Sequence, residues 1–316
     1  MVTPENVVPS ASLVDSQGDV KPFKENQIYE ELQEQCLKNG CNFEDPEFPA
    51  CASSLAVATR GLNIEWKRPK DITNGAVFLM DASPSDVIQG DLDDCWFLAP
   101  AAFLTQKPDL FSFVVPSNQD IESGILHFRF WQEDEGLWVD VVIDDRLPAQ
   151  QDEITGNWNL IYARSGQDQQ YWCPLLEKAF AKLNESYDNL NGANVSEGLQ
   201  CLTSYKCQEV EIYEDNLNEI LNVVTEGGKN GSFMGFNVKH TSPEFRRRHI
   251  YTIGEVYHDA SDGTCWLKIH GASDSFTGSI GLDTRTPPSE LSAENELWLP
   301  VDEFCGIGEI LFVSHS

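Results

Sequence analysis

The chain is poor in basic residues. It has 21 lysines and arginines against 51 aspartates and glutamates, so its formal net charge is −30 over 316 residues. A phosphate backbone requires a basic protein face, and anionic lipid attracts basic clusters in the same way. The composition therefore excludes a generic nucleic-acid binder and argues against docking to anionic membranes. The acidic excess leaves two interpretations open: a solvated surface, and carboxylates that bind a cation such as calcium.

Long apolar runs and metal-type cysteine pairs are also missing. No run approaches the roughly 18 apolar residues of a membrane-spanning helix, and the polar N-terminus does not resemble a signal peptide. The nine cysteines are odd in number and lack paired C-x-x-C spacing, which favours free thiols. We therefore expect a cytoplasmic protein without membrane insertion.

What is present is the composition of a packed protein. A hydrophobic content of 41% with 10% aromatics is too rich for a disordered acidic chain. Residues 1–27 lack periodicity and predict a flexible leader. A change of pattern near Gly192 predicts a helical subdomain over 28–192 and a β-rich subdomain over 193–316.

Hydrophobic spacing supports this division. Residues 27–40 and 172–192 show helical spacing that ends on a glycine, and alternation over 125–148 around an acidic turn predicts a β-hairpin. Beyond Gly192 the chain changes to short strands broken by Gly, Asp and Ser. The pattern predicts an α+β protein of two lobes with a cleft between them.

Cys95 stands where a loop bearing Gly and Asp becomes an apolar helix. At a helix N-terminus, the free N–H groups and the dipole stabilise a thiolate. A thiolate nucleophile also needs a base and an oxyanion donor, for which His249 and Gln89 are candidates on opposite lobes. Taken singly, each of these residues has a plain packing interpretation.

Several long segments carry a family resemblance in the same order along the chain. They are QGDLDDCWFL at 89–98, FEDPEFPACASSL at 43–55, WKRPKDI at 66–72, WVDVVIDDRLP at 138–148, WCPLLEKAFAKLNESYDNLNGANVSEG at 172–198 and ELWLPVDEF at 296–304. The chain resembles the calpain family of papain-like cysteine endopeptidases over roughly residues 28–316. The resemblance implies a papain-like core with a helical lobe that carries the nucleophile and a β-rich lobe that carries the base.

The resemblance also implies roles for individual residues. Cys95 falls on the nucleophile, Gln89 on the oxyanion-hole side chain and His249 on the general base. The family orients its histidine with the Asn of an RNPWG motif, and the stretch here reads KIHGAS, which places His270 at the Asn position. Ala272 replaces the Trp that shields this bond in the family. We expect a wetter and weaker bond here.

Three further departures bear on the nucleophile and the base. Asp93 replaces a Gly of the family, and a carboxylate beside a thiol raises the thiol pKa. Pro100 lies in the nucleophile helix, where it removes a backbone hydrogen bond or kinks the helix. The run Arg246–Arg248 precedes His249, and its field disfavours imidazolium.

Calcium is the cofactor that the resemblance implies, with one ion in each lobe. In the front lobe, Asp86 matches a bidentate Asp of the family, and Gln170 stands where the family has Glu, with a carbonyl but no charge. In the rear lobe, Glu294 and Glu296 match an acidic pair. Asp274 and Asp283 align ambiguously and are further candidates.

These observations predict a calcium-dependent cysteine endopeptidase that acts on protein substrates through a thioester, with a regulatory protein partner as an option. The alternative is a catalytically impaired module that binds peptides or proteins, which the changes at Asp93, His270 and Ala272 motivate. A third hypothesis is a calcium-binding regulatory fragment in which Cys95 is inert.

Overall fold

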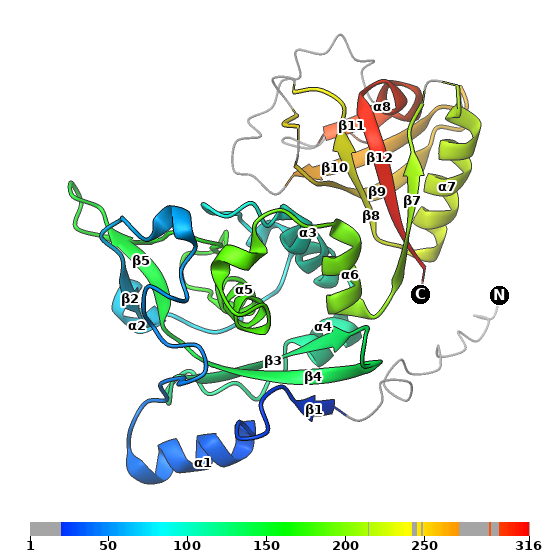
Figure 1. Ribbon diagram of the computed structural model, residues 1–316. Helices are drawn as coiled ribbons and strands as arrows, with labels where there is room; N and C mark the ends of the chain where they lie inside the picture. The colour runs from blue at the N-terminus through cyan, green and yellow to red at the C-terminus, as the bar shows by residue number, and fades with distance from the viewer. Residues whose placement is uncertain are drawn as a thin grey trace, which may run out of the picture.

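The structure is a computed structural model, and it describes residues 20–213, 215–241, 245–247, 249–271, 291 and 297–315. These residues form two lobes (Figure 1). The front lobe ends with helix α6 (Val195–Thr203), and the rear lobe starts with strand β7 (Lys206–Glu211). Each lobe has its own hydrophobic core. The predicted α+β class, a papain-like two-lobe core, is confirmed.

The front lobe contains more β-structure than its pattern predicted, because two three-stranded sheets pack around its helices. Their orders are β1-β4-β3 and β2-β5-β6. The helices are α1 (Tyr29–Asn39), α2 (Pro69–Ile72), α3 (Cys95–Leu104), α4 (Pro108–Val114), α5 (Trp172–Leu183) and α6, with 3₁₀ turns η2 (Val57–Thr59), η3 (Pro84–Asp86) and η4 (Tyr187–Leu190). The strands are β1 (Val20–Pro22), β2 (Glu65–Lys67), β3 (Ile125–Gln132), β4 (Leu137–Asp144), β5 (Leu147–Gln151) and β6 (Trp158–Leu160).

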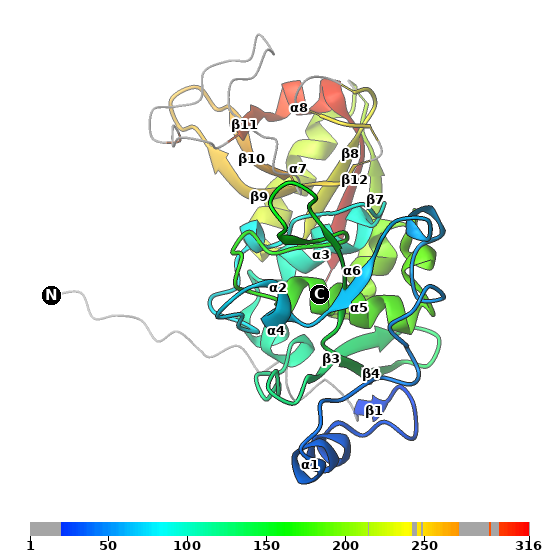
Figure 2. The same cartoon turned by 90° about the vertical axis from the view of Figure 1, so that its left-hand side faces the viewer.

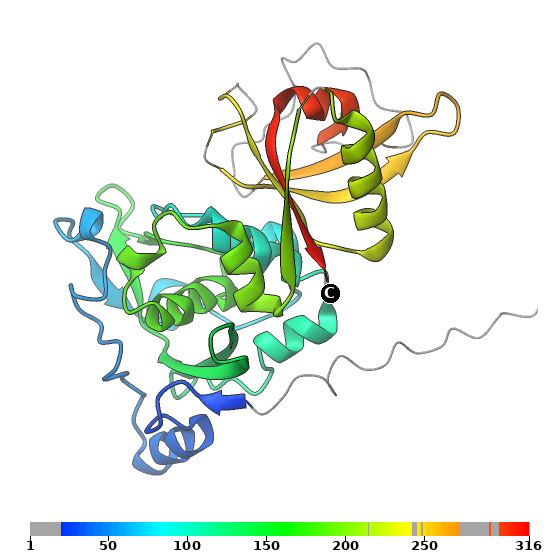
Figure 3. The same cartoon turned by 45° about the vertical axis from the view of Figure 1, so that its right-hand side comes forward.

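The rear lobe is built on one six-stranded antiparallel sheet with the order β11-β10-β9-β8-β12-β7. Helix α7 runs along this sheet (Figure 3) and packs against β9, β12 and α8. The remaining elements are α7 (Leu217–Asn230), β8 (Met234–Val238), β9 (Tyr251–His258), β10 (Cys265–Gly271), β11 (Leu297–Pro300), α8 (Val301–Ile307) and β12 (Gly308–His315). No helix in the described part of the chain is long and apolar enough to cross a lipid bilayer.

The two lobes meet over helices α3 and α6. Figure 2 shows the rear sheet above these helices. Phe233, which precedes β8, contacts Phe103 of α3 edge-on with ring centroids 5.4 Å apart. Phe233 and Phe312 of the rear lobe both belong to the front core. Apolar burial therefore joins the lobes along α3, with Phe233 against the C-terminal part of the helix and Phe312 beside the cavity that Cys95 lines.

Several local predictions agree with the structure. Helix α1 ends before Gly40, whose φ of 59° is the left-handed conformation that favours glycine after a helix. The hairpin predicted over 125–148 is the pair β3 and β4, with all eight residues of each strand in register. Helix α5 ends at Leu183, earlier than the predicted stop at Gly192. The predicted domain boundary near Gly192 stays a prediction, and α6 beyond it packs in the front core.

Pro100 neither breaks nor ends α3, which continues to Leu104. Proline has no N–H to donate to the carbonyl of Trp96, four residues earlier. Gly198 of α6 packs over this carbonyl, and a Cβ at position 198 would lie 2.4 Å from the Trp96 oxygen. The close approach of α6 therefore covers the part of α3 that proline leaves without a hydrogen bond.

Candidate active site

Cys95 is the first residue of α3 and is 4% exposed. The helix is apolar on all sides, and each of its residues except Ala102 is buried. Packing therefore fixes the direction of α3 and the place of its N-terminus. The loop before it is held against residues 161–163 by the hydrogen bond from the N–H of Asp91 to the carbonyl of Ile161, at 2.8 Å.

Two residues of this loop determine its path. A Cβ at Gly90 would lie 2.2 Å from the carbonyl oxygen of Tyr162, so only glycine fits there. Gln89 Nε2 donates to the carbonyl of Leu92 at 2.7 Å. This bond curls the loop and holds the carboxamide that the resemblance assigns to the oxyanion hole.

The rear lobe supplies His249 at the entry to β9. Its ring contacts the ring of Tyr251 edge-on, with centroids 4.8 Å apart. The hydroxyl of Tyr251 accepts the N–H of Arg246 at 2.7 Å, which ties the segment before His249 to the sheet. The Nε2 atom of His249 is buried without a hydrogen-bond partner among the described residues.

A cavity of about 490 Å³ joins the two lobes at this place. Cys95 lines it from the front lobe, and Ile250, the residue after His249, lines it from the rear lobe. The backbone N–H of Ile250 hydrogen-bonds to the Cys95 thiol. The cavity is lined by Asp93, Cys95, Trp96, Gly192, Ala193, Asn194, Val195, Asn237, Ile250 and Phe312.

The sequence missed the part of this wall that Gly192, Ala193 and Asn194 form. The N–H of Gly192 donates to the carbonyl of Asp93 at 2.9 Å, and the N–H of Asp93 donates to Asn191 at 3.1 Å. These reciprocal bonds hold the wall against the nucleophile loop. The pattern predicts a helix stop and a subdomain boundary at Gly192, and the Asn-Gly pair of Asn191 and Gly192 also suits a turn beside a site.

Burial dominates the acid–base properties of Cys95. Desolvation raises the pKa of its thiol to about 11; the N–H of Ile250 lowers the pKa, and Asp93 and Asp94 raise it. The thiolate stabilisation predicted from the helix N-terminus is therefore outweighed in this conformation. The predicted opposing effect of Asp93 is confirmed.

His249 is shifted toward its neutral form. Burial lowers the pKa of His249 to about 4, Arg246 lowers it further, and Asp93 acts in the opposite direction. The predicted effect of the arginine run is thus confirmed for Arg246, while Arg248 lies outside the described residues. At neutral pH the pair is a thiol and a neutral imidazole rather than an ion pair.

The structure does not bring His270 to His249. In the β9–β10 ladder His270 pairs with Thr252, and Gly271 pairs with Tyr251. Neighbouring strand residues point to opposite faces, so His270 lies on the face opposite Tyr251, whose ring contacts His249. Its imidazole covers Gly254, where a Cβ would lie 2.2 Å from His270 Nε2.

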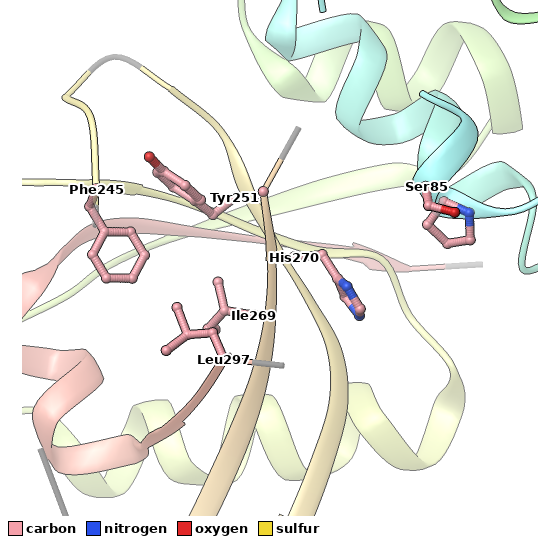
Figure 4. Close-up of a pocket in the computed structure, with 8 residues that line it drawn as sticks. Ser85, Phe245, Tyr251, Ile269, His270 and Leu297 are labelled. Atoms are coloured by element: carbon pink, nitrogen blue, oxygen red, sulfur yellow. The ribbon is translucent and has the colours of Figure 1, made fainter. Parts of the chain in front are cut away.

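Figure 4 shows the two sides of β10 beside a small cavity of about 190 Å³. Tyr251 and Ile269 lie on one side of β10 with Phe245, whereas the His270 ring points away from them. Gly271 holds the register position on the side of Tyr251, and it has no side chain. Ala272 lies outside the described residues.

The front-lobe calcium ligands expected from the resemblance are satisfied by protein donors. Asp86 is buried; its Oδ2 accepts the N–H of Ser83 at 2.7 Å and its Oδ1 accepts Gln167 Nε2 at 3.1 Å. The carbonyl oxygen of Gln170 accepts the N–H of Met80 at 2.7 Å. The pair offers one carboxylate and one neutral amide, and their oxygens already accept hydrogen bonds from the protein. This set of ligands does not fit a divalent cation in this conformation.

The rear-lobe candidates Glu294, Glu296, Asp274 and Asp283 lie outside the described residues. Within the part of the chain that is described, no three His, Cys, Asp or Glu side chains are grouped as a metal site would require.

The fold and the site define a class of protein: a papain-like cysteine protease core, with a cysteine at a helix N-terminus facing a histidine segment of a second lobe across a cleft. Comparison with known proteins gives the family. Residues 43–276 match the calpain family cysteine protease domain, and the chain belongs to this family.

Individual relatives match over most of the chain. It is 36% identical to calpain clp-1 of Caenorhabditis elegans over 313 residues, which are 90% of this chain and 39% of that protein. It is 38% identical to the calpain-2 catalytic subunit of Mus musculus over 314 residues, 88% of this chain and 43% of the relative. It is 40% identical to calpain-B of Drosophila melanogaster over 72% of this chain and 25% of the relative. The chain thus spans less than half the length of these relatives.

Proposed function

We propose that the chain hydrolyses peptide bonds in protein substrates as a calpain-like cysteine endopeptidase. The observation that carries the proposal is the cleft in which Cys95, at the start of α3, meets Ile250, the neighbour of His249. Family membership supports the same conclusion.

The mechanism starts from a neutral pair. Cys95 Sγ attacks the carbonyl carbon of the scissile peptide while His249 accepts the thiol proton. The carbonyl oxygen becomes an oxyanion, which the second N–H of Gln89 Nε2 and the backbone N–H of Cys95 stabilise. His249 then returns the proton to the leaving amine as the C–N bond breaks. Water hydrolyses the thioester, with His249 as base, and restores the thiol.

The test measures cleavage of casein by the full chain and by Cys95→Ser, together with the rate at which iodoacetamide alkylates Cys95. We expect cleavage that the serine variant loses. Exposed Cys41 and Cys51 serve as the reference for the alkylation rate. If Cys95 reacts faster than they do only when a peptide substrate analogue or calcium is present, the site is activated on binding. Absence of cleavage under every condition would contradict the proposal.

A second candidate, a peptide-binding module without turnover, is favoured by one set of observations. The pKa values of Cys95 and His249 are shifted toward the inactive neutral pair, and Gly271 offers no side chain to orient His249. This candidate predicts that casein peptides bind with unchanged affinity to wild type and Cys95→Ser, and that neither cleaves them.

Calcium dependence enters as part of the proposal, with its site in the rear lobe. The front-lobe pair Asp86 and Gln170 does not fit the ion, so the response rests on Glu294 and Glu296. Calorimetric titration with calcium chloride should lose its signal in the double variant Glu294→Gln, Glu296→Gln and keep it in Asp86→Asn. The reverse pattern would move the site to the front lobe.

Location and partners complete the proposal. All nine cysteines are unpaired in the structure, which suits the reducing cytoplasm. One of the relatives is named a catalytic subunit. By analogy we propose that this core works with a regulatory protein partner.

A further inference from the structure

Asp94 directly precedes the nucleophile and is 0% exposed. Its backbone carbonyl accepts the N–H groups of Phe97 and Leu98, at 2.9 and 3.1 Å, as the N-cap of α3. Its side chain caps nothing, neither carboxylate oxygen meets an N–H donor at full hydrogen-bond distance and angle, and the side chains that act on it are the Gln89 carboxamide and the Glu177 carboxyl. A carboxylate buried without a donor or a counter-charge is strongly unfavourable. The charge state of Asp94 therefore needs a physical explanation.

The group that faces Asp94 is a second buried carboxyl, that of Glu177 on α5. Glu177 is 1% exposed, and its two oxygens lie 3.0 and 3.1 Å from the backbone nitrogen of Ala163. Its carboxyl group hydrogen-bonds to that of Asp94. Two carboxyl groups form such a bond only when one of them carries a proton, because two carboxylates offer acceptors alone.

The neighbouring lysine does not neutralise the carboxyl pair. Lys178, next to Glu177 on α5, donates to Asp144 at 2.6 Å instead. Burial and the neighbouring carboxyl raise the pKa of Glu177 well above its usual range, and burial raises the pKa of Asp94 to about 6. Further acids interact with the pair: Asp93, Cys95, Cys173, Tyr162 and Tyr187.

The pair also lies where three parts of the site meet. Ala163, which Glu177 binds, follows the residues on which the nucleophile loop rests, since Gly90 packs on the carbonyl of Tyr162. The carboxamide of Gln89 interacts favourably with ionised Asp94. A chain of contacts thus runs from α5 through the carboxyl pair to the oxyanion loop and to Cys95.

We propose that Glu177 and Asp94 share one proton at neutral pH, with Glu177 as donor, and that this carboxyl pair positions the oxyanion loop and the N-terminus of α3. Both are positioning residues, since neither lines the cleft. The inference rests on the proposed peptidase function only for its activity readout.

The shared proton makes stability depend on pH in a defined direction. A carboxyl whose pKa is higher in the folded than in the unfolded chain contributes stability at low pH that is lost as pH rises through the folded pKa. Removing the last proton would leave two buried carboxylates in contact. Stability and loop order therefore fall on the alkaline side because of this pair.

Two substitutions at Glu177 separate this role from plain packing. In Glu177→Gln the amide oxygen can accept from Ala163 and the amide N–H₂ can donate to Asp94, as the protonated acid does, but it cannot ionise. In Glu177→Met the volume is kept and the donor is lost. Glu226→Gln, on the exposed face of α7, is the matched control.

The experiment measures urea unfolding from pH 5.5 to 9 and, where cleavage is detected, kcat and KM over the same range. The wild-type urea midpoint should fall with rising pH, and the midpoint of Glu177→Gln should fall less over the same interval. In cleavage, Glu177→Met should lose about 10²-fold in kcat with little change in KM, as for a small displacement of catalytic groups, and Glu177→Gln should recover most of it. The control should follow wild type in both measurements.

Infrared difference spectra between wild type and Glu177→Gln at pH 7 give a readout that needs neither activity nor the methionine variant. They should show the carbonyl band of a protonated carboxylic acid in the wild type alone. Absence of that band, or equal pH slopes of stability in wild type and Glu177→Gln, would overturn the shared proton. An inactive wild type that shows both signatures would contradict the peptidase proposal and leave the pair supported.

Discussion

Within the residues that the structure describes, the front lobe fixes its part of the site through several backbone and packing contacts, and the rear lobe fixes its own through fewer. Around Cys95, the loop with Gln89 is fixed by Gly90, by backbone hydrogen bonds to Ile161 and Arg164 and by the apolar burial of α3. Around His249, the described contact is one ring of Tyr251, and Nε2 has no partner among the described residues. The difference suggests that catalysis depends on how the rear lobe completes a nearly preformed front lobe.

The unequal support also explains the charge states. Burial is the largest cause in both cases: it raises the pKa of the Cys95 thiol and lowers the pKa of the His249 imidazole. A substrate that donates to the thiolate or a ligand that repositions His249 would shift both values toward the active form. Activation then needs no refolding of the front lobe.

The largest effect on this comparison is expected from removing Gln89, the proposed oxyanion donor of the front lobe. Gln89→Ala deletes the Nε2 group and its bond to Leu92, so we expect a loss of about 10²- to 10³-fold in kcat with KM nearly unchanged. Gln89→Glu, which keeps the shape and places a charge beside the oxyanion, should lose at least as much. Kinetics on a fluorogenic casein substrate measure both variants.

A similar loss in KM alone would mean that Gln89 binds substrate and does not stabilise the oxyanion. Asn237, which lines the rear wall of the cavity, supplies the matched control in Asn237→Ala. We expect that substitution to alter KM more than kcat.

A smaller effect should follow from removing the carboxylate beside the nucleophile. Asp93 raises the pKa of Cys95, so Asp93→Asn should lower that pKa and speed alkylation by iodoacetamide below pH 9 by up to about 10-fold. Because the thiol pKa is about 11, the wild-type rate should rise steadily with pH across this range. Mass spectrometry of the modified Cys95 peptide measures the rate.

Asp91→Asn tests whether this effect is local. Asp91 is an exposed acid of the same loop and does not act directly on Cys95 in the way that Asp93 does. Equal acceleration in the two variants would assign the effect to the general negative field of the chain.

Much of the fold could be predicted because its signals are local. The start of α3 at Cys95, the hairpin of β3 and β4 and the rear strands follow from periodicity and turn residues within short windows. Strands β1, β2, β5 and β6 were not predicted, because β1 pairs with β4 from Val20 to Trp138 and β2 pairs with β5 from Glu65 to Ala149, far apart in the sequence. Short strands such as these have no independent pattern.

The candidate site was predictable in its residue types and less so in its geometry. The apolar context of Glu177 in the LLEKAF segment was a usable signal of a buried carboxyl, but its partner Asp94 could be found only in three dimensions. The side of the sheet on which His270 lies depends on the register of β10 against β9, because a shift of one residue moves a side chain to the opposite face. The charge states of Cys95 and His249 depend on burial, which a local sequence pattern does not reveal.

The register of β10 gives the prediction with the smallest expected effect. His270 faces away from Tyr251, so His270→Asn should leave turnover nearly unchanged. Gly271→Asn places an amide on the Tyr251 side, where a Cβ would lie 3.5 Å from that ring, an ordinary contact. If the amide reaches His249, it should raise kcat several-fold, because an oriented imidazole is the better base. Casein cleavage kinetics of the two variants decide between the two register positions. A large gain in kcat for His270→Asn with none for Gly271→Asn would show that His270 is the orienting residue.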